Sequence, residues 1–414
     1  MKKIYLILLA VLGMTATSCL MEEKELFDKT AAERLDAYLT EYNTLLESSE
    51  NGWLLEYYAE EEQSYGGYAY ILQFAEGEVT AYFQLADKLD ETRTSYYKLT
   101  TDDGPVLTFD TYNEYIHFFA TPDIENYQAL QGDYEFRILA LSEDASEITI
   151  QGKRTGNYMK LRKFEQDPVQ YLTKSADVEA AMAAPAYSVT VDGTTYPASI
   201  SNNVLTFSYS VAEGEASTPV EVSISFCYTP DGVSFYETAE VNGASYDVMA
   251  YDATNTRLST EDGKFAINPV FPPVNELFVG GDWLLDLAGC SQATAAQFMK
   301  GFNAVGAKGY PFNFAFMGDD YYGSWGFNVN FAGYGGVLNF DYELVGEDKI
   351  TMQFNLTAGG NGGTFYNWGL SQSIVPLGLA APKTFTITAD DNKNPMVFVL
   401  TDDADPNNVI QFVY

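Results

Sequence analysis

The chain has 414 residues and a formal net charge of −36 at pH 7, with 58 acidic against 22 basic side chains. A surface with this charge repels phosphate backbones, which excludes nucleic acid as a partner, and it also disfavours electrostatic docking to anionic lipid head groups. The length predicts two or three domains, and an aromatic content of 15% argues against disorder, because these rings supply area that a folded core can bury.

The first residues have the pattern of an export signal. Lys2 and Lys3 form a basic start, and the apolar run at 4–12 is shorter than the roughly 20 residues that span a bilayer. Small residues then precede Cys19. The pattern resembles the lipobox of bacterial lipoproteins, which implies that residues 1–18 are removed and that acyl chains such as palmitate anchor Cys19 stably. Cleavage of an ordinary secretory signal is the alternative.

The residues after the cysteine suggest where the anchored protein is displayed. Glu22 and Glu23 resemble the acidic tag of Bacteroidetes lipoproteins that face outward from the outer membrane. The expected location is therefore the outer membrane, lipid-anchored and on the cell surface, with the periplasmic face as the alternative. No later segment has enough consecutive apolar residues for a membrane span.

The first folded region is expected to contain one helix followed by short strands. Thr30 and Glu33 form a capping box, and apolar residues at helical spacing predict a helix that ends near Asn51-Gly52. From 53 to 163 apolar and polar residues alternate, which predicts short antiparallel strands in a barrel or a bent sheet. One of these strands is expected at 116–119.

The rest of the chain is also expected to combine helices with strands. Pro168 begins a predicted helix, and hairpins are predicted at four pairs after it, 192–193, 231–232, 242–243 and 262–263. A further helix is expected from Ser291 to about Asn303. The predicted fold is mainly β with a few helices, in antiparallel barrel-like or sandwich units. The predicted parts are the lipoprotein signal peptide 1–18, the tether 19–29, the helix plus β domain 30–165, the middle β domain 166–273 and the Gly- and aromatic-rich β domain 274–414.

Two short segments begin alike. Residues 51–56 and 281–286 each contain a tryptophan followed by two leucines and an acidic residue. A duplicated β unit would explain the likeness, and so would the frequency of tryptophan at strand starts, so the sequence leaves both interpretations open.

The sequence does not decide whether the cysteines form a disulfide. Besides Cys19, only Cys227 and Cys290 are present. They could pair in an oxidising envelope, but the sequence does not give the Cα separation that a disulfide requires. Cys227 falls on the polar face of an alternating strand, where either a disulfide or a second packed layer is expected.

Catalytic motifs are scarce. His117 is the only histidine, so a Ser-His-Asp triad or a zinc site with histidine ligands has one participant at most, and a structural histidine is favoured. The glycine-rich run at 359–363 lacks the residues of a phosphate-binding loop. Paired carboxylates could hydrolyse a glycoside, but among 58 acidic residues such pairs have no specificity. A non-catalytic protein without a cofactor is therefore favoured.

Two acidic turns in the last third invite comparison with calcium loops. The segment 390–395 has Pro395 where the sharp turn needs glycine, and Thr401 stands where the bidentate glutamate should be. Hairpin loops are the favoured interpretation, and weak surface calcium binding at 402–405 is left open.

Aromatic residues on loops give the main affirmative indication of function. Rings exposed beside glycine-rich stretches would stack on sugars or hold a peptide, whereas burial in the core is the favoured alternative for aromatics on strands. The predicted ligand-binding residues are Tyr321, Tyr322, Trp325, Phe365, Tyr366 and Trp368.

Several segments stand in a characteristic order along the first half of the chain. They are 50–53, 57–58, 66–68, 95–97, 104–113, 132–136 and 152–157. Together they resemble a family of Bacteroidetes lipoproteins classed as a domain of unknown function, closely over about 30–165 and more loosely to about 290. The resemblance carries no catalytic residues, and it implies an association with outer-membrane importers.

The expected function is therefore non-catalytic capture of a nutrient, either a glycan or a peptide, by a surface-exposed lipoprotein that could join an importer complex. Two alternatives remain open. One is a carboxylate-dependent glycoside hydrolase, and the other is a structural or adhesive module of the cell surface.

Overall fold

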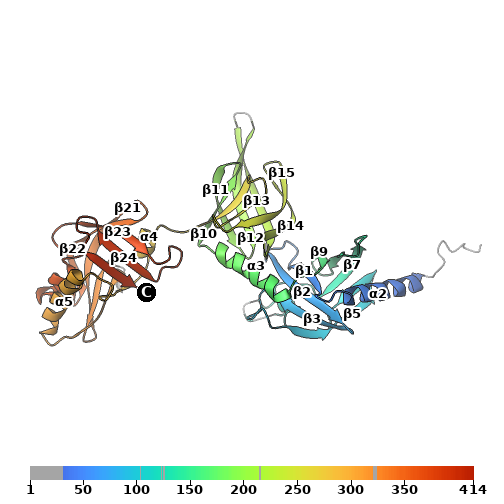
Figure 1. Cartoon of the computed structure of the whole chain (residues 1–414), viewed down its shortest axis with the longest axis horizontal. Coiled ribbons are helices and arrows are strands. Elements are labelled where there is room, and N and C mark those ends of the chain that lie inside the picture. Colours follow the sequence, from blue (N-terminus) through green and yellow to red (C-terminus); the bar gives the residue numbers. More distant parts are fainter. Residues whose placement is uncertain (1–30, 103, 123, 125, 214–215, 320–323) are drawn as a thin grey trace, which may run out of the picture. The chain divides into compact units, whose positions relative to one another are not determined.

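Antiparallel strands dominate the computed structural model of this chain (Figure 1). Strand makes up 47% of the structure and helix 18%, which confirms the predicted mainly β fold. The chain divides into two compact units, of which unit 1 contains the residues up to 183 and 187–268, and unit 2 contains 184–186 and 269–414. The structure describes residues 31–102, 104–122, 124, 126–213, 216–319 and 324–414.

Helix α2 (Ala31–Glu47) leads into the first strand. The helix ends before the predicted Asn51-Gly52, because the backbone N–H of Ser48 donates to the carbonyl oxygen of Leu45 over 3.1 Å and so tightens the last turn. The indole N–H of Trp53 donates to the carbonyl oxygen of Leu46 over 2.9 Å. This bond fixes the end of the helix against the first strand.

The first ring of strands consists of β1 (Trp53–Tyr58), β2 (Gly67–Ala75), β3 (Glu78–Phe83), β4 (Arg93–Tyr96), β5 (Lys98–Thr101), β6 (Pro105–Thr108), β7 (Glu135–Leu141), β8 (Glu147–Gly152) and β9 (Tyr158–Lys163). β1 pairs with both β2 and β9, so the last strand returns to the first. β4 and β5 act as two halves of one bent strand, since β4 pairs with β3 and β5 pairs with β6.

The predicted strand at 116–119 is wrong. These residues form turns and a short 3-10 helix, η1 (Phe118–Ala120). The side-chain carbonyl of Asn113 accepts hydrogen bonds from the backbone N–H groups of Tyr115 and Ile116, over 3.1 and 3.3 Å. Because these bonds satisfy locally the donors that a strand would offer to a neighbour, the chain turns instead of extending.

The second ring consists of β10 (Ala186–Val191), β11 (Thr194–Ser201), β12 (Val204–Glu213), β13 (Ala216–Thr229), β14 (Gly232–Val241), β15 (Ala244–Asp252), β16 (Arg257–Ser259) and β17 (Phe265–Val270). β10 pairs with both β11 and β17, which closes this ring as well. The predicted hairpin turns at 192–193 and 242–243 are confirmed, with positive φ at all four positions, as a two-residue hairpin turn of this type requires.

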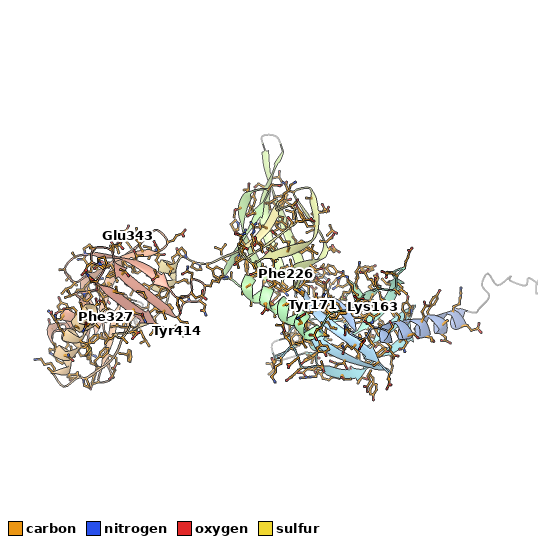
Figure 2. The ribbon with its side chains drawn as sticks, viewed as in Figure 1. Lys163, Tyr171, Phe226, Phe327, Glu343 and Tyr414 are labelled. Carbon is orange, nitrogen blue, oxygen red and sulfur yellow. The ribbon has the colours of Figure 1, made fainter. Side chains whose placement is uncertain are left out.

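Helix α3 (Pro168–Met182) contributes to the cores of both rings of unit 1 (Figure 1). It begins at the predicted proline, and the side chain of Asp167 caps it by accepting a 2.7 Å hydrogen bond from the backbone N–H of Gln170. Near its start the helix buries Tyr171, labelled in Figure 2, in the core of the first ring, and at its end it buries Met182 in the core of the second.

The two rings of unit 1 also contact each other directly. Cys227 in β13 forms a parallel bridge with Gly67 in β2. The side-chain N–H of Asn203 donates to the carbonyl oxygen of Gly67, and the Ser225 hydroxyl donates to that of Gln63, each over 3.1 Å. These bonds join the loop before β2 to the second ring.

Unit 2 contains the third ring, whose strands are β18 (Trp283–Leu285), β19 (Phe312–Asp319), β20 (Trp325–Phe331), β21 (Tyr334–Val345), β22 (Lys349–Gly360), β23 (Lys383–Ala389), β24 (Val397–Asp402) and β25 (Val409–Val413). Its helices are α4 (Val274–Val279), α5 (Gln292–Gly306), α6 (Gly362–Asn367) and the 3-10 helix η2 (Leu370–Ile374). β18 pairs with β19 and β25, which closes the ring around a core that includes Phe327 (Figure 2). Helix α5 confirms the predicted helix after Ser291.

The likeness between 51–56 and 281–286 has a structural counterpart. Trp283 opens β18 as Trp53 opens β1, and its indole N–H donates to the carbonyl oxygen of Phe278, at the end of α4, over 2.9 Å. In both rings the first strand pairs with the second and with the last. The second ring closes in the same way without such a segment, so the indole contact is the specific shared feature and a duplicated unit stays a hypothesis.

Candidate functional site

Four of the six predicted ligand-binding aromatics are accounted for by packing or lie outside the described residues. Tyr321 and Tyr322 lie outside them. Trp325 is 8% exposed and Phe365 is 2% exposed, and both belong to the core of unit 2. Both rings help to fill the interior of the third ring, as the favoured alternative of core burial expects, and the interpretation that they are exposed for ligand binding does not hold.

The glycine-rich segment before Phe365 serves packing. A Cβ on Gly362 would lie 2.1 Å from the carbonyl oxygen of Val337, so glycine lets α6 approach β21 closely. Tyr366 stacks on Phe354 with ring centroids 5.3 Å apart, and Trp368 lies near Tyr310 at 5.2 Å. Tyr366 and Trp368 are half-buried, and ligand binding by them stays a prediction.

The two described cysteines are free thiols in different units, so the structure contains no disulfide between Cys227 and Cys290. Cys227 is fully buried, and its Sγ lies 3.9 Å from the side-chain oxygen of Gln84. Its strand is covered by α3 and β2, which is the second packed layer that the sequence left open. Burial raises the pKa of the Cys227 thiol well above its ordinary value, which makes it a poor nucleophile.

His117 lies between two tyrosine rings. Its ring centroid is 5.4 Å from that of Tyr112 and 4.9 Å from that of Tyr134. The backbone N–H of Asn113 donates to the imidazole Nδ1 over 3.2 Å. Burial lowers the pKa of His117 below its ordinary value, so the ring is neutral at physiological pH and fills a packing position.

The carboxylates in the acidic turns of unit 2 bind other groups of the protein itself. Asp390 accepts hydrogen bonds from the backbone N–H groups of Asp391, Met396 and Val397. Asp402 forms an ion pair with Lys383. Within the residues that the structure describes, no group of three or more His, Cys, Asp or Glu side chains could hold a metal ion.

A cleft of about 870 Å³ opens between the first and second rings of unit 1. We call it the tyrosine cleft. One wall is formed by β1, β8 and β9 of the first ring, and the other by β13, β14 and β15 of the second ring. The polar side chains on the two walls include Tyr158, Lys160, Arg162, Tyr236, Glu237 and Asp247.

The first-ring wall of the tyrosine cleft carries Glu56, Lys160 and Arg162, which form an ion-pair network with the neighbouring Glu147. This network is called the floor network below. Arg162 lies 3.0 Å from a Glu56 oxygen and 3.2 Å from a Glu147 oxygen, and Lys160 lies 2.8 Å from the second Glu147 oxygen. Burial lowers the pKa of Arg162, but the adjacent carboxylates raise it to a net value above the ordinary one. Burial raises the pKa of Glu147, yet hydrogen bonds from the two cations lower it overall. Arg162 and Glu147 therefore stay charged.

Tyrosines connect the two walls. The rings of Tyr58 and Tyr236 lie 4.7 Å apart, and a Cβ on Gly67 would lie 2.5 Å from the Tyr58 ring, so glycine makes room for it. The Tyr236 hydroxyl accepts a 3.1 Å hydrogen bond from the backbone N–H of Tyr158, whose own side chain is 61% exposed. Burial raises the pKa of Tyr58 and of Tyr236, so both hydroxyl groups remain neutral donors.

The wall from the second ring presents exposed acidic groups. Asp247 accepts a 2.6 Å hydrogen bond from the hydroxyl of Thr238, and Glu237 is exposed beside it in the chain. Considering only the described part of the chain, neither carboxylate has a Lys, Arg or His partner within 4.0 Å. Val248 adds an exposed apolar side chain to the same wall.

Unit 2 has a separate cleft of about 720 Å³. Its apolar side comes from the loop 375–382, and Lys383 and Asp402 lie at its base. Asp402 is fully buried and also accepts a 3.0 Å hydrogen bond from the side chain of Asn408. Because these charges satisfy each other, this cleft offers mainly apolar contacts to a ligand.

The tyrosine cleft was not predicted from the sequence, because its lining residues range from 56 to 248 along the chain. The segments that contain Tyr58 and Gly67 entered only as part of the family resemblance. Tyr58 on β1 lies opposite Gly67 on β2, and a bulky aromatic opposite a glycine could have indicated the cleft. Such a pair can be recognised only when the register of the two strands is known. Periodicity alone does not give that register.

Among the described residues, no helix has the length and apolar character to cross a membrane.

Solved structures offer no usable guide to this fold. The DNA polymerase III beta chain of Streptococcus pneumoniae is 9% identical, with 91% of this chain and 97% of that chain covered and a TM-score of 0.10. The DNA polymerase III subunit beta of Pseudomonas aeruginosa is 10% identical, with 92% of this chain and 95% of that chain covered and a TM-score of 0.11. The DNA polymerase sliding clamp of Caulobacter crescentus is 11% identical, with 89% of this chain and 91% of that chain covered and a TM-score of 0.12. Superpositions of this quality carry no argument.

Family membership rests on the sequence. No curated protein matches the chain. The family model described as a domain of unknown function, DUF4302, matches residues 23–253. The match extends over more than half of the chain and includes every residue that lines the tyrosine cleft. The chain belongs to the DUF4302 family.

Proposed function

We propose that this protein is a lipoprotein of the Bacteroidetes type, anchored in the outer membrane through Cys19 and exposed on the cell surface, which binds a nutrient without chemical change. The nutrient is a glycan or a peptide that is passed to an importer. The lipobox-like sequence supports the anchor, and Cys19 itself lies outside the described residues. The observation that carries the binding role is the tyrosine cleft in the family region.

The tyrosine cleft has properties of a ligand site. Its volume of about 870 Å³ lies within the roughly 300–1,000 Å³ of typical small-ligand pockets. Tyr58, Tyr236 and the floor network are fixed by ring contacts, hydrogen bonds and ion pairs. A site whose side chains are already held in place loses little conformational entropy when a ligand binds.

The state of the carboxylates in the floor network supports binding rather than hydrolysis. A glycosidase needs a general acid whose pKa is raised, so that the group is protonated near neutral pH. The net pKa of Glu147 is lowered by its two cations, and Glu56 is paired with Arg162 and accepts a hydrogen bond from Ser234. Such groups serve as fixed acceptors.

The anchor is tested by metabolic labelling with a fatty-acid probe. The wild-type protein is expected to incorporate the probe and to remain with the membrane fraction, whereas Cys19→Ala is expected to do neither. Protease treatment of intact cells then distinguishes the outer surface from the periplasmic face. An unlabelled wild-type protein that is released into the medium would contradict the anchor.

The binding role is tested by screening the purified protein against arrays of glycans and peptides. Tyr158→Ala and Tyr236→Ala are expected to weaken the binding of any hit about tenfold, because contact with an aromatic ring contributes on the order of 1 kcal/mol. Tyr96→Ala is the matched control, since Tyr96 is 57% exposed on β4, away from the cleft. Equal losses in all three variants would contradict a site in the cleft.

A further inference from the structure

The charges around the tyrosine cleft do not balance. The floor network contains two carboxylates and two cations, and each cation lies within 3.2 Å of a carboxylate oxygen. The network therefore has no free positive charge to offer an anionic ligand. On the opposite wall Glu237 and Asp247 add two negative charges without a basic partner in the described part of the chain. The cleft as a whole carries an excess of negative charge.

Aromatic rings share the same space as these acids. Tyr158 is 61% exposed, and the ring of Tyr236 is half-buried against Tyr58. The face of a tyrosine ring attracts an ammonium or guanidinium group held within about 6 Å of its centre. A 3.1 Å hydrogen bond from the backbone N–H of Tyr158 to the Tyr236 hydroxyl helps to hold that ring in place.

From this arrangement we infer that the ligand of the tyrosine cleft is a short peptide with a positive charge, which lies between Tyr158 and the carboxylates of Glu237 and Asp247. The inference rests on the proposed binding function and names its ligand class. An anionic sugar would be repelled by the excess charge, and a neutral sugar would use the acids only as hydrogen-bond acceptors. A cleft of about 870 Å³ limits the bound ligand to a short peptide segment.

The net charge of −36 acts in the same direction. A strongly acidic protein attracts cationic ligands over several ångströms, and this attraction raises the association rate most at low ionic strength. We therefore expect the association rate of a cationic peptide to fall as salt is added.

The test uses three fluorescent pools of tetrapeptides with blocked ends, which differ only at one fixed position. That position carries lysine, acetyl-lysine or glutamate, and the other positions are randomised among uncharged residues. Acetylation removes the charge while the length of the side chain is nearly kept. Fluorescence anisotropy with the full-length protein is expected to show binding of the lysine pool and about tenfold weaker binding of the acetyl-lysine pool. A neutral oligosaccharide, maltohexaose, is tested in parallel by calorimetry.

Variants locate the charge that matters. The double substitution Glu237→Gln and Asp247→Asn keeps the shape of both side chains, and it is expected to weaken binding of the lysine pool about five- to tenfold, as the loss of two exposed charge contacts implies. Glu240→Gln is the matched control, because Glu240 is an exposed acid on the same strand, β14, but does not line the cleft. All three side chains are exposed, so folding is expected to be unaffected.

Four outcomes would overturn the inference. Equal binding of the lysine and acetyl-lysine pools would remove the role of charge. Unchanged affinity in the double variant would remove the role of Glu237 and Asp247. Binding of maltohexaose with no binding of any peptide pool would identify a glycan as the ligand class, which contradicts the inference but leaves nutrient binding standing. Failure of every pool, of the oligosaccharide and of the array screen would contradict the proposed function as well.

Discussion

At the scale of single residues, Glu179 on α3 is a carboxyl group whose surroundings favour its uncharged form. Burial raises its pKa, and a 3.3 Å hydrogen bond from the side chain of Gln84 opposes this shift only in part. Because the pKa of Glu179 is higher in the folded than in the unfolded chain, this group stabilises the fold at pH values below its unfolded pKa of about 4.3. That contribution is lost as the pH rises through the folded pKa. We expect Glu179→Gln to raise the thermal unfolding midpoint of unit 1 near pH 7 and to change it little below about pH 4. A lower midpoint near pH 7, with no change in the exposed control Glu165→Gln, would contradict this.

Asp402 in unit 2 has the opposite dependence on pH. Burial raises its pKa, but hydrogen bonds from Lys383 and Asn408 lower it overall. Its contribution to stability is therefore present above the unfolded value of about 3.9 and is lost as the pH falls through the folded value. Lys383→Met is expected to destabilise unit 2 by about 3 kcal/mol near pH 7, because it leaves a buried carboxylate unpaired. Urea denaturation measures this, with Lys308→Met on the surface as the control, and equal stability of the two variants would count against the ion pair.

At the scale of elements, the contact between an indole and the end of a helix occurs in two rings. Trp53→Phe and Trp283→Phe each remove one N–H donor from a buried carbonyl oxygen at 2.9 Å, so each is expected to cost about 1–3 kcal/mol. Because the two residues lie in different units, each substitution should lower the stability of its own unit. Calorimetry with limited proteolysis can follow the two units separately. A loss confined to unit 1 in both variants would refute the equivalence of the two contacts.

The elements that could be predicted are those whose cause is local. Pro168 and Asp167 start α3, Ser291 starts α5, and the pairs at 192–193 and 242–243 make hairpin turns, because each depends on a backbone preference or a bond within a few residues. The error at 116–119 has a local cause too. Asn113 offers its side-chain carbonyl to nearby N–H groups, and alternation of apolar residues does not show whether such a bond forms.

The candidate site could not be predicted because it depends on contacts between distant segments. The tyrosine cleft brings Glu56 of β1 close to Arg162 of β9 and Ser234 of β14. The pairing of β1 with β9 decides the first contact, and the packing of the two rings decides the second. The sequence singled out Trp325 and Phe365 instead, since aromatic residues beside glycines suggest exposed loops. Their burial follows from ring closure in unit 2, which composition does not indicate.

At the scale of the whole molecule, the acidic excess acts against folding as well as for ligand attraction. A net charge of −36 places like charges within reach of one another, and their repulsion is relieved in the expanded chain. Salt screens this repulsion over a distance of about 10 Å at 0.1 M. We expect the thermal unfolding midpoint near pH 7 to rise between about 10 and 300 mM NaCl, as measured by circular dichroism. A midpoint that falls with salt would show that ion pairs such as the floor network outweigh the repulsion.

Closure of the three rings has a consequence for how the protein behaves among its own copies. An open sheet ends in a row of unsatisfied amide and carbonyl groups, on which another chain can assemble. Here the terminal strand of each ring bonds to the initial one, so copies packed densely side by side offer one another few templates for intermolecular strand addition. The architecture thus suits a protein held at high local density, where sheets with exposed margins would join into aggregates.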